Sequence, residues 1–144
     1  MNNDVRLPEG ALDLLVRARE ADAKIGIVGP RVLYKAEPGR IWCAGGKMTW
    51  TQNLSTLLGH RAPDGPEWRV TREVDYVAGC ALLARREVLE KVGLFDARYF
   101  AYMEDVDLCL RAKRAGYGVR MIGEAAAYHA SSSATGGGYN PRRK

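Results

Sequence analysis

Hydrophobic and polar residues recur along the chain with two periods, one helical and one extended. Helical spacing marks three segments, residues 9–21, 85–91 and 104–115. Gly93 and Gly116 follow the second and third segments as typical helix stop signals. Runs rich in β-branched and aromatic residues predict strands at 25–34, 41–43, 47–50, 73–77, 118–122 and 125–129. Helices that alternate with strands predict an α/β fold with a mixed β-sheet flanked by helices.

Glycine and proline residues punctuate this pattern. Gly29-Pro30 predicts a break or bulge within the 25–34 strand, and Gly45-Gly46 predicts a hairpin that joins 41–43 to 47–50. Residues 51–69 are polar and contain two glycines and two prolines, which predicts a long surface loop. The Ser/Gly-rich and basic residues 131–144 predict a flexible tail.

Size and charge limit the classes of function. A chain of 144 residues is large enough for one domain with a hydrophobic core, and its longest apolar run, 76–84, is too short to span a membrane. The net charge of +5 suits a nucleic acid, an anionic membrane surface or a nucleoside diphosphate. The basic residues are spread out, and no aromatic–basic RNA motif or helix-turn-helix pattern accompanies them. A nucleic-acid partner is therefore not expected.

The three cysteines, Cys43, Cys80 and Cys109, form no CxxC motif. An odd number of cysteines, two of them inside apolar segments, predicts buried free thiols in a reducing compartment. Only His60 and His129 are available to join them as metal ligands, and no zinc-ligand spacing is present. A zinc site is therefore not expected.

Three carboxylates fall within four residues, Glu104-Asp105-Val106-Asp107, at the predicted start of the third helix. The positive end of a helix dipole stabilises ionised carboxylates in the first turn. A carboxylate at such a loop–helix junction is well placed to accept a proton from a substrate hydroxyl. The alternative is that these are ordinary first-turn acids, with Asp107 and Arg111 forming an i,i+4 pair.

Four stretches follow one another along the chain: Asn2-Asn3-Asp4, Asp75–Leu89, Gly93–Asp96 leading into Tyr102–Arg111 with Ala115-Gly116-Tyr117, and Tyr128-His129. With these stretches in this order, the sequence resembles family-2 glycosyltransferases, with the bacterial rhamnosyltransferase-like enzymes as the nearest branch. The resemblance implies a GT-A-like fold. It also implies transfer of a sugar, with inversion, from a nucleotide-sugar donor to an acceptor hydroxyl in polysaccharide or glycolipid assembly.

The resemblance implies catalytic roles for the acidic pair and for a metal site. Asp105 matches the catalytic base of the family, and Glu104 would help to orient the acceptor. Asp4 matches the last carboxylate of the Asp-X-Asp motif, which holds Mg²⁺ or Mn²⁺ on the donor diphosphate. His129 matches a histidine that completes the metal site in some members, and imidazole is an acceptable Mn²⁺ ligand. A structural role for His129, at the end of a strand, is the alternative.

Three further residues are implied to contact donor or acceptor. Asn2 stands where the first acid of the Asp-X-Asp motif is often found, and an amide oxygen is a weaker ligand than a carboxylate. Asp75 and Gly79 resemble the acceptor-side strand and turn, where glycine would let the backbone approach the sugar closely. The alternatives are that Asn2 to Asp4 form a turn or helix cap, and that Gly79 marks a bulge in a core strand.

In the family, a nucleotide-binding half precedes the Asp-X-Asp motif. The resemblance therefore implies that residues 1–130 correspond to the C-terminal half of a GT-A domain and lack that N-terminal half. We expect such a chain to be weakly active or inactive alone, and to form homo-oligomers through an exposed sheet edge. A non-catalytic, self-associating binding module derived from the same fold is the alternative.

Partners and location follow from the same resemblance. A nucleotide-sugar donor and a saccharide or lipid-linked saccharide acceptor are expected. The expected location is the cytoplasm, including peripheral association with the inner face of the membrane.

Overall fold

The computed structural model describes residues 1–49, 54–99 and 102–130, so the predicted tail 131–144 lies outside the described residues. The helices are α1 (Ala11–Glu20), α2 (Arg86–Val92) and α3 (Glu104–Arg114), with a short 3-10 helix η1 (Pro66–Trp68). The strands are β1 (Val5–Arg6), β2 (Ile25–Tyr34), β3 (Ile41–Cys43), β4 (Gly46–Met48), β5 (Ser55–Leu57), β6 (Arg72–Glu73), β7 (Leu83–Ala84) and β8 (Gly118–His129). The class is mixed α/β, as the sequence predicts.

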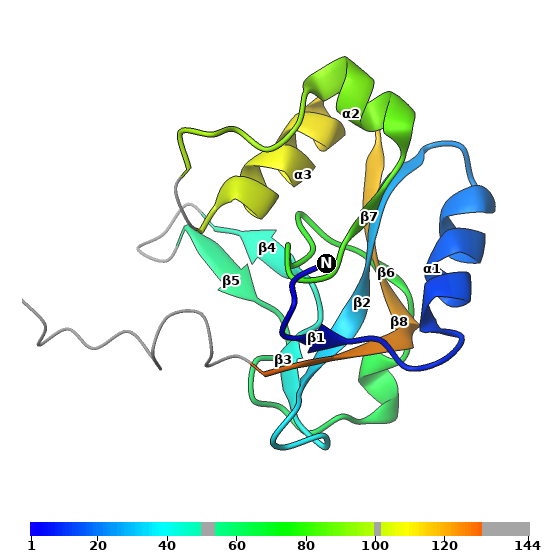
Figure 1. Cartoon of the computed structure of the whole chain (residues 1–144), viewed down its shortest axis with the longest axis vertical. Helices are drawn as coiled ribbons and strands as arrows, with labels where there is room; N and C mark the ends of the chain where they lie inside the picture. Colours follow the sequence, from blue (N-terminus) through cyan, green and yellow to red (C-terminus); the bar gives the residue numbers. More distant parts are fainter. Residues whose placement is uncertain (50–53, 100–101, 131–144) are drawn as a thin grey trace, which may run out of the picture.

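The long strands β2 and β8 form the centre of a six-stranded sheet and run parallel to each other (Figure 1). The short strands β1 and β6 pair with β8, while β3 and β7 pair with β2, all in antiparallel fashion. β4 and β5 form a separate two-stranded sheet. Because one parallel pair carries antiparallel neighbours on both sides, the sheet is mixed.

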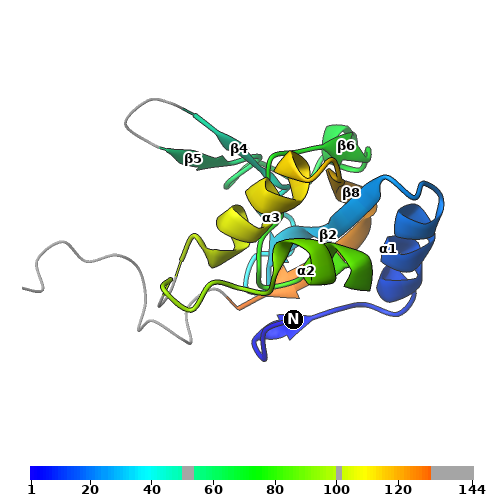
Figure 2. The same cartoon turned by 90° about the horizontal axis from the view of Figure 1, so that it is seen from above.

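The helices cover the two faces of the sheet, which gives three layers (Figures 1 and 2). Neighbouring residues of β2 point to opposite faces. Ile27 belongs to the hydrophobic cluster that includes Val106 and Leu108 of α3, whereas Val28 belongs to the cluster that includes Leu15 of α1. The central strands are thus buried on both faces, as their nearly continuous apolar sequence indicates.

The predicted break at Gly29-Pro30 is a change of register within one continuous strand. β2 pairs Pro30 with Ile122 but the next residue, Arg31, with Ala126, so β8 accommodates extra residues at this point. The two strands expected at 118–122 and 125–129 are therefore the single strand β8. Arg31 donates a hydrogen bond to the carbonyl of Gly123 within this irregular stretch. The Gly123 carbonyl thus gains a donor that regular strand pairing does not supply there.

The prediction of a hairpin around Gly45-Gly46 is wrong. β3 pairs with β2, and β4 pairs with β5, so the chain changes sheets between 43 and 46. Gly45 has a φ of +84°, a conformation that favours glycine. Strand pairing is non-local here, which a two-glycine turn signal does not reveal.

The predicted long loop and two predicted boundaries also need correction. Residues 51–69 contain β5 and η1 rather than a continuous loop. The 73–77 strand is reduced to β6, because the chain then leaves β8 and Tyr76 bridges to Gly46. The first helix begins at Ala11 rather than at residue 9, because Gly10 before it has a φ of +77°.

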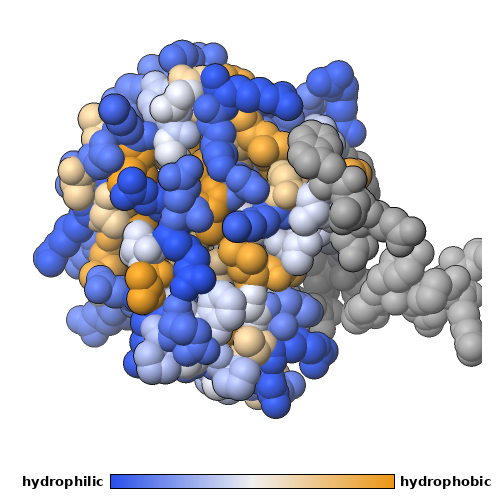
Figure 3. Space-filling model, turned by 180° about the vertical axis from the view of Figure 1, so that it is seen from behind, coloured by the Kyte–Doolittle hydropathy of each residue, from blue (hydrophilic) through white to orange (hydrophobic). Residues whose placement is uncertain are grey.

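The described residues contain no helix that is both long and apolar enough to cross a membrane. On the face seen in Figure 3, hydrophobic atoms form small groups interrupted by hydrophilic ones.

Candidate functional site

A pocket of about 570 Å³ lies where β1, the end of β8, the start of α3 and the turn before β7 meet. This volume is typical of small-molecule sites. Six of the seven residues singled out from the sequence line it: Asn2, Asp4, Gly79, Glu104, Asp105 and His129. The remaining lining residues are Trp42, Ser55, Leu57, Tyr76, Ala78, Cys80, Tyr102, Met103 and Val106.

Strand pairing brings Asp4 and His129 together from opposite ends of the chain. β1 pairs with the end of β8 so that Val5 lies opposite His129, and the N–H of Ala130 donates to the Asp4 carbonyl at 3.1 Å. The side chains follow this register, with His129 Nε2 3.1 Å from Asp4 Oδ2. Both side chains are about nine-tenths buried. An acid and an imidazole therefore share one wall of the pocket.

Trp42 packs edge-on against the imidazole of His129, with ring centroids 4.5 Å apart. The indole limits rotation of the histidine and keeps Nε2 directed at Asp4. His129 Nδ1 is buried and has no hydrogen-bond partner among the described residues.

The chemistry of the Asp4–His129 pair fits a divalent cation. A carboxylate oxygen and an imidazole nitrogen suit Mn²⁺, and Mg²⁺ sites commonly use one or two carboxylates together with substrate phosphates. No group of three or more His, Cys, Asp or Glu side chains that could hold a metal occurs within the described ranges. Two protein ligands would therefore need oxygens from a bound diphosphate, or water, to complete the coordination.

Asp105, which also lines the pocket, is held in place by backbone hydrogen bonds. Its Oδ2 accepts from the Gly79 N–H at 2.7 Å, and its Oδ1 accepts from the Val106 N–H at 2.8 Å. These two bonds define the orientation of the carboxylate. Each oxygen keeps a further lone pair, so Asp105 can still accept a proton from a bound hydroxyl.

Glu104 and the residues before it form the entrance to α3. Glu104 Oε2 is buried without a hydrogen-bond partner among the described residues. Tyr102 and Met103 have φ values of +69° and +71°, which are uncommon for residues other than glycine. Such strain often occurs at functional sites. Here these two residues lead into α3, whose first two residues, Glu104 and Asp105, line the pocket.

Asn2 is tied to the turn that contains Gly79. Its backbone N–H donates to the carbonyl of Cys80 at 2.8 Å. The segment that carries Asp4 and the turn that holds Asp105 are therefore joined through the backbone.

Asp75 lies outside the set of residues that line the pocket. Its carboxylate accepts hydrogen bonds from Lys113 Nζ at 2.6 Å and from the Met48 N–H at 2.9 Å. Burial alone would raise the pKa of Asp75, but these bonds, with the charges of Lys113 and Lys47, hold the pKa below its ordinary value. Asp75 thus braces the β4–β5 sheet, which carries Ser55 and Leu57 to the pocket, against α3.

Two ionisable side chains that line the pocket, Tyr76 and Cys80, have raised pKa values. Burial raises the pKa of Tyr76 to about 12 and the pKa of Cys80 to about 12. Both groups therefore remain neutral at physiological pH, and the acidic side chains that line the pocket are Asp4, Glu104 and Asp105.

Three aromatic residues of the pocket, Trp42, Tyr76 and Tyr102, were not identified from the sequence as site residues. The aromatic run before Glu104 was a visible signal for Tyr102. No local pattern marks Trp42, because its position depends on pairing between β3 and β2.

The arrangement matches known folds and sequences. A solved structure described as GalNAc-T7 with UDP, GalNAc and Mn²⁺ shares the fold, with a TM-score of 0.63 at 14% identity. The match covers 87% of this chain and 26% of that structure. The six-stranded mixed sheet with its three helices is thus GT-A-like over part of that larger protein.

Two bacterial rhamnosyltransferases are similar in sequence. N-acetylglucosaminyl-diphospho-decaprenol L-rhamnosyltransferase of Mycobacterium tuberculosis is 31% identical over 94% of this chain. Rhamnosyltransferase WbbL of Escherichia coli is 42% identical over 54% of it. The matches cover 47% of the mycobacterial protein and 29% of WbbL. The chain therefore spans about half the length of the first relative and a smaller share of the second. The model of the glycosyl transferase family group 2 matches residues 1–144. The resemblance seen in the sequence is confirmed, and the chain belongs to this family.

Proposed function

We propose that the pocket is the reaction site of an inverting, rhamnosyltransferase-like sugar transfer from a nucleotide-sugar donor to an acceptor hydroxyl. The observation that carries the proposal is the arrangement of charge in one pocket. The Asp4–His129 pair and Asp105, which accepts from the Gly79 N–H, line the same pocket. Inverting displacement needs the leaving diphosphate and the acceptor base at separate positions around the sugar.

Asp105 acts as the base in this proposal. As the acceptor oxygen forms its bond to the anomeric carbon and the bond to the diphosphate breaks, the acceptor proton passes to Asp105. Glu104, with its buried and unbonded Oε2, holds an acceptor hydroxyl in position. Asn2 and Gly79 also line the pocket and would contact the sugars.

Asp4 and His129 would hold Mg²⁺ or Mn²⁺, which when bound neutralises charge on the departing diphosphate. Asp4 supplies a carboxylate oxygen and His129 supplies Nε2, which Trp42 keeps in position. With only two protein ligands, the oxygens of the donor diphosphate would supply further ligands to the cation.

The acceptor in this proposal is a saccharide carried on a lipid diphosphate. The name of the mycobacterial relative specifies such an acceptor, a decaprenol-linked sugar, for that protein. The reaction would then take place in the cytoplasm, at the inner face of the membrane. Because the matched region is 47% of that relative, we expect transfer by this chain alone to be weak. The first test therefore measures binding.

The binding test is a calorimetric titration of Mn²⁺ into the chain, with and without dTDP as the nucleoside diphosphate. We expect binding that strengthens when dTDP is present, and a loss of at least about tenfold in Mn²⁺ affinity in Asp4→Asn. Asp13→Asn, which removes an exposed carboxylate of α1, is the matched control. Equal affinities in the two variants would refute the metal assignment. A folded chain that binds neither Mn²⁺ nor dTDP would favour a non-catalytic module.

The catalytic test compares Asp105→Asn with Asp107→Asn, two neutral isosteres on the same turn of α3. Asp105→Asn should lower kcat by about 10²–10⁴-fold, the usual contribution of a general base. Asp107→Asn breaks the 2.8 Å pair with Arg111 and should change stability rather than kcat. Similar kcat values for the two variants would exclude Asp105 as the base.

A further inference from the structure

Tyr102 differs from the other two aromatic side chains that line the pocket. Tyr76 is 3% exposed and belongs to the central hydrophobic cluster, and Trp42 packs against His129. Tyr102 is 69% exposed. Among the described residues, no hydrogen bond, ring contact or cation–π contact engages its side chain. An aromatic ring that stands in water at the mouth of a pocket offers its faces to a ligand.

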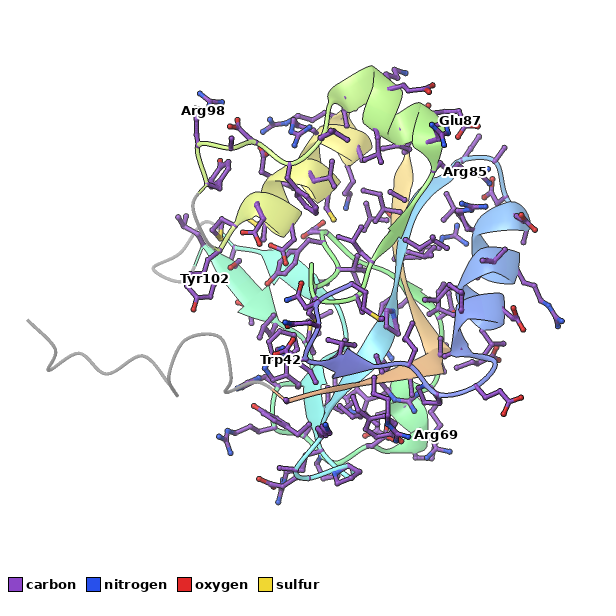
Figure 4. The ribbon with its side chains drawn as sticks, in the orientation of Figure 1. Trp42, Arg69, Arg85, Glu87, Arg98 and Tyr102 are labelled. Carbon is purple, nitrogen blue, oxygen red and sulfur yellow. The ribbon has the colours of Figure 1, made fainter. Side chains whose placement is uncertain are left out.

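The backbone fixes where the Tyr102 ring stands. Tyr102 and Met103 both have positive φ values, +69° and +71°, which neither residue type favours. Met103 is anchored inside, because it packs on the central hydrophobic cluster and its Sδ accepts from Ser55 Oγ at 3.9 Å. In Figure 4, Tyr102 lies at the outer edge of the molecule beside the start of α3, and Trp42 lies further in. Strain that holds an aromatic ring in solvent is typical of a functional position.

Two carboxylates follow the Tyr102 ring in the sequence and line the same pocket. Glu104 and Asp105 are the first two residues of α3. Glu104 Oε2 is buried and has no hydrogen-bond partner among the described residues. Each oxygen of Asp105 accepts one backbone N–H and keeps a further lone pair. These oxygens suit a ligand that carries several O–H groups.

A pyranose ring has both features that this surface requires. Its faces carry C–H groups, which pack on the electron-rich face of an aromatic ring. Its hydroxyls project from the edge of the ring, where they can donate to carboxylates. A lipid chain supplies no donor, and the base of thymidine supplies only its imide N–H. The combination of Tyr102 with Glu104 and Asp105 therefore favours a sugar ring.

We propose that Tyr102 determines acceptor specificity by stacking on the C–H face of a pyranose ring, whose hydroxyls then reach Glu104 and Asp105. That this sugar is the acceptor rests on the proposed function, in which Asp105 is the base. The stacking contact itself rests on the exposed ring, its strained backbone and the two carboxylates. Sugars with equatorial hydroxyls are favoured, because both faces of such a ring are free of hydroxyl groups.

The test is NMR saturation transfer from the chain to methyl β-glucopyranoside and to its 2-acetamido derivative, without donor or metal. Titration of the signal gives the dissociation constant. Tyr102→Asn removes the ring and keeps the backbone, because asparagine adopts positive φ more readily than tyrosine. Tyr102→Phe removes only the hydroxyl. Tyr99→Asn is the matched control, since Tyr99 is 41% exposed and is not among the residues that line the pocket.

We expect Tyr102→Asn to bind both glycosides about three- to tenfold more weakly, the usual effect of losing one aromatic contact. Tyr102→Phe and Tyr99→Asn should bind like the unchanged chain. Glucitol, a linear polyol with no ring face, should give a signal that does not depend on Tyr102. In urea unfolding, Tyr102→Asn should be no less stable than the unchanged chain, because the ring supports no packing and the strain is relieved.

Several outcomes would overturn the proposal. They are absence of glycoside binding, equal binding by Tyr102→Asn and the unchanged chain, and equal losses in Tyr102→Asn and Tyr99→Asn. A loss in Tyr102→Phe as large as in Tyr102→Asn would assign the contact to the hydroxyl instead. A marked loss of stability in Tyr102→Asn would make the ring structural.

Thymidine distinguishes a sugar from a nucleobase as the occupant. Saturation transfer to thymidine that depends on Tyr102, with glycoside binding unchanged in Tyr102→Asn, would overturn the proposal in favour of the base. Because neither a metal nor a nucleotide sugar is present, failure here leaves the proposed function standing. The Mn²⁺ and kcat measurements test that function separately.

Discussion

Gly79 and Asp105 are in direct contact with each other in the lining of the pocket. The Gly79 N–H donates to Asp105 Oδ2 at 2.7 Å, and a Cβ added at position 79 would lie 2.9 Å from the Cβ of Asp105. Glycine is required here because of close approach, and no unusual backbone angle is involved. The residue that orients the proposed base must therefore lack a side chain.

Gly79→Ala should consequently displace Asp105. We expect the free energy of unfolding to fall by about 1–3 kcal/mol, the usual effect of overpacking, and kcat to fall by about 10²-fold because the base moves. Gly39→Ala is the control, since a Cβ there meets no atom within 4 Å. Urea denaturation and the rate of sugar transfer are the measurements. Equal stability and activity in the two variants would show that the pocket tolerates a methyl group beside Asp105.

Asp75 should make stability depend on pH. Its pKa is lower in the folded protein than its ordinary value, so its stabilising effect is present above about pH 4 and is lost as the pH falls through the folded-state value. Asp75→Asn should cost about 0.5–1 kcal/mol at pH 7, because the group is partly exposed, and much less at pH 3. Urea unfolding at both pH values measures this.

Glu73→Gln is the control for Asp75, since Glu73 lies 4.0 Å from Lys113 and is largely exposed. It should change stability little at either pH. A loss in Asp75→Asn that is as large at pH 3 as at pH 7 would show that the ionised carboxylate is not responsible.

Local signals in the sequence predicted the helices better than the strand pairing. α3 begins at Glu104 and ends just before Gly116, where dipole and stop signals place it. The register change of β8 was missed, because the Gly123 region reads as a turn between two strands. It remains within one strand because Arg31 and the parallel partner β2 hold it. Such contacts join residues about ninety positions apart, beyond the reach of local pattern.

Some features of the candidate site were likewise predicted from the sequence, and others were missed. Ordered motifs pointed to Asp4, Asp105 and His129, and strand register and helix position bring all three to one pocket. The positive φ values of Tyr102 and Met103 have no sequence signature, because neither residue favours that conformation. Asp75 illustrates the converse, since its motif suggested a ligand contact while its hydrogen bonds support the β4–β5 sheet.

The cysteines should be unreactive in the folded protein. Burial raises the pKa of Cys43, of Cys80 and of Cys109 to about 12, so almost no thiolate exists at pH 8. We expect slow labelling by a disulfide reagent such as DTNB in buffer, and three thiols per chain in denaturant. Rapid native labelling of one thiol would contradict this, and Cys80 would be the first residue to examine because it lines the pocket.

Arg31 and Asp64 form a buried pair that joins β2 to the segment before η1. Arg31 Nε lies 2.9 Å from Asp64 Oδ1, with side-chain exposures of 7% and 12%. Asp64→Ala should lower the free energy of unfolding by about 3 kcal/mol, because it leaves a buried guanidinium without its counter-charge. The exposed pair Arg40–Glu37 is the control, and Glu37→Ala should cost about 0.5 kcal/mol.

A double-mutant cycle separates the loss of the Arg31–Asp64 pair from the cost of an isolated charge. Arg31→Met combined with Asp64→Ala should be more stable than the sum of the single effects predicts, because no charge then remains buried. Urea unfolding of the four proteins gives the coupling energy. Additive effects would mean that Arg31 is stabilised mainly by the Gly123 carbonyl, to which it also donates, and that Asp64 contributes little.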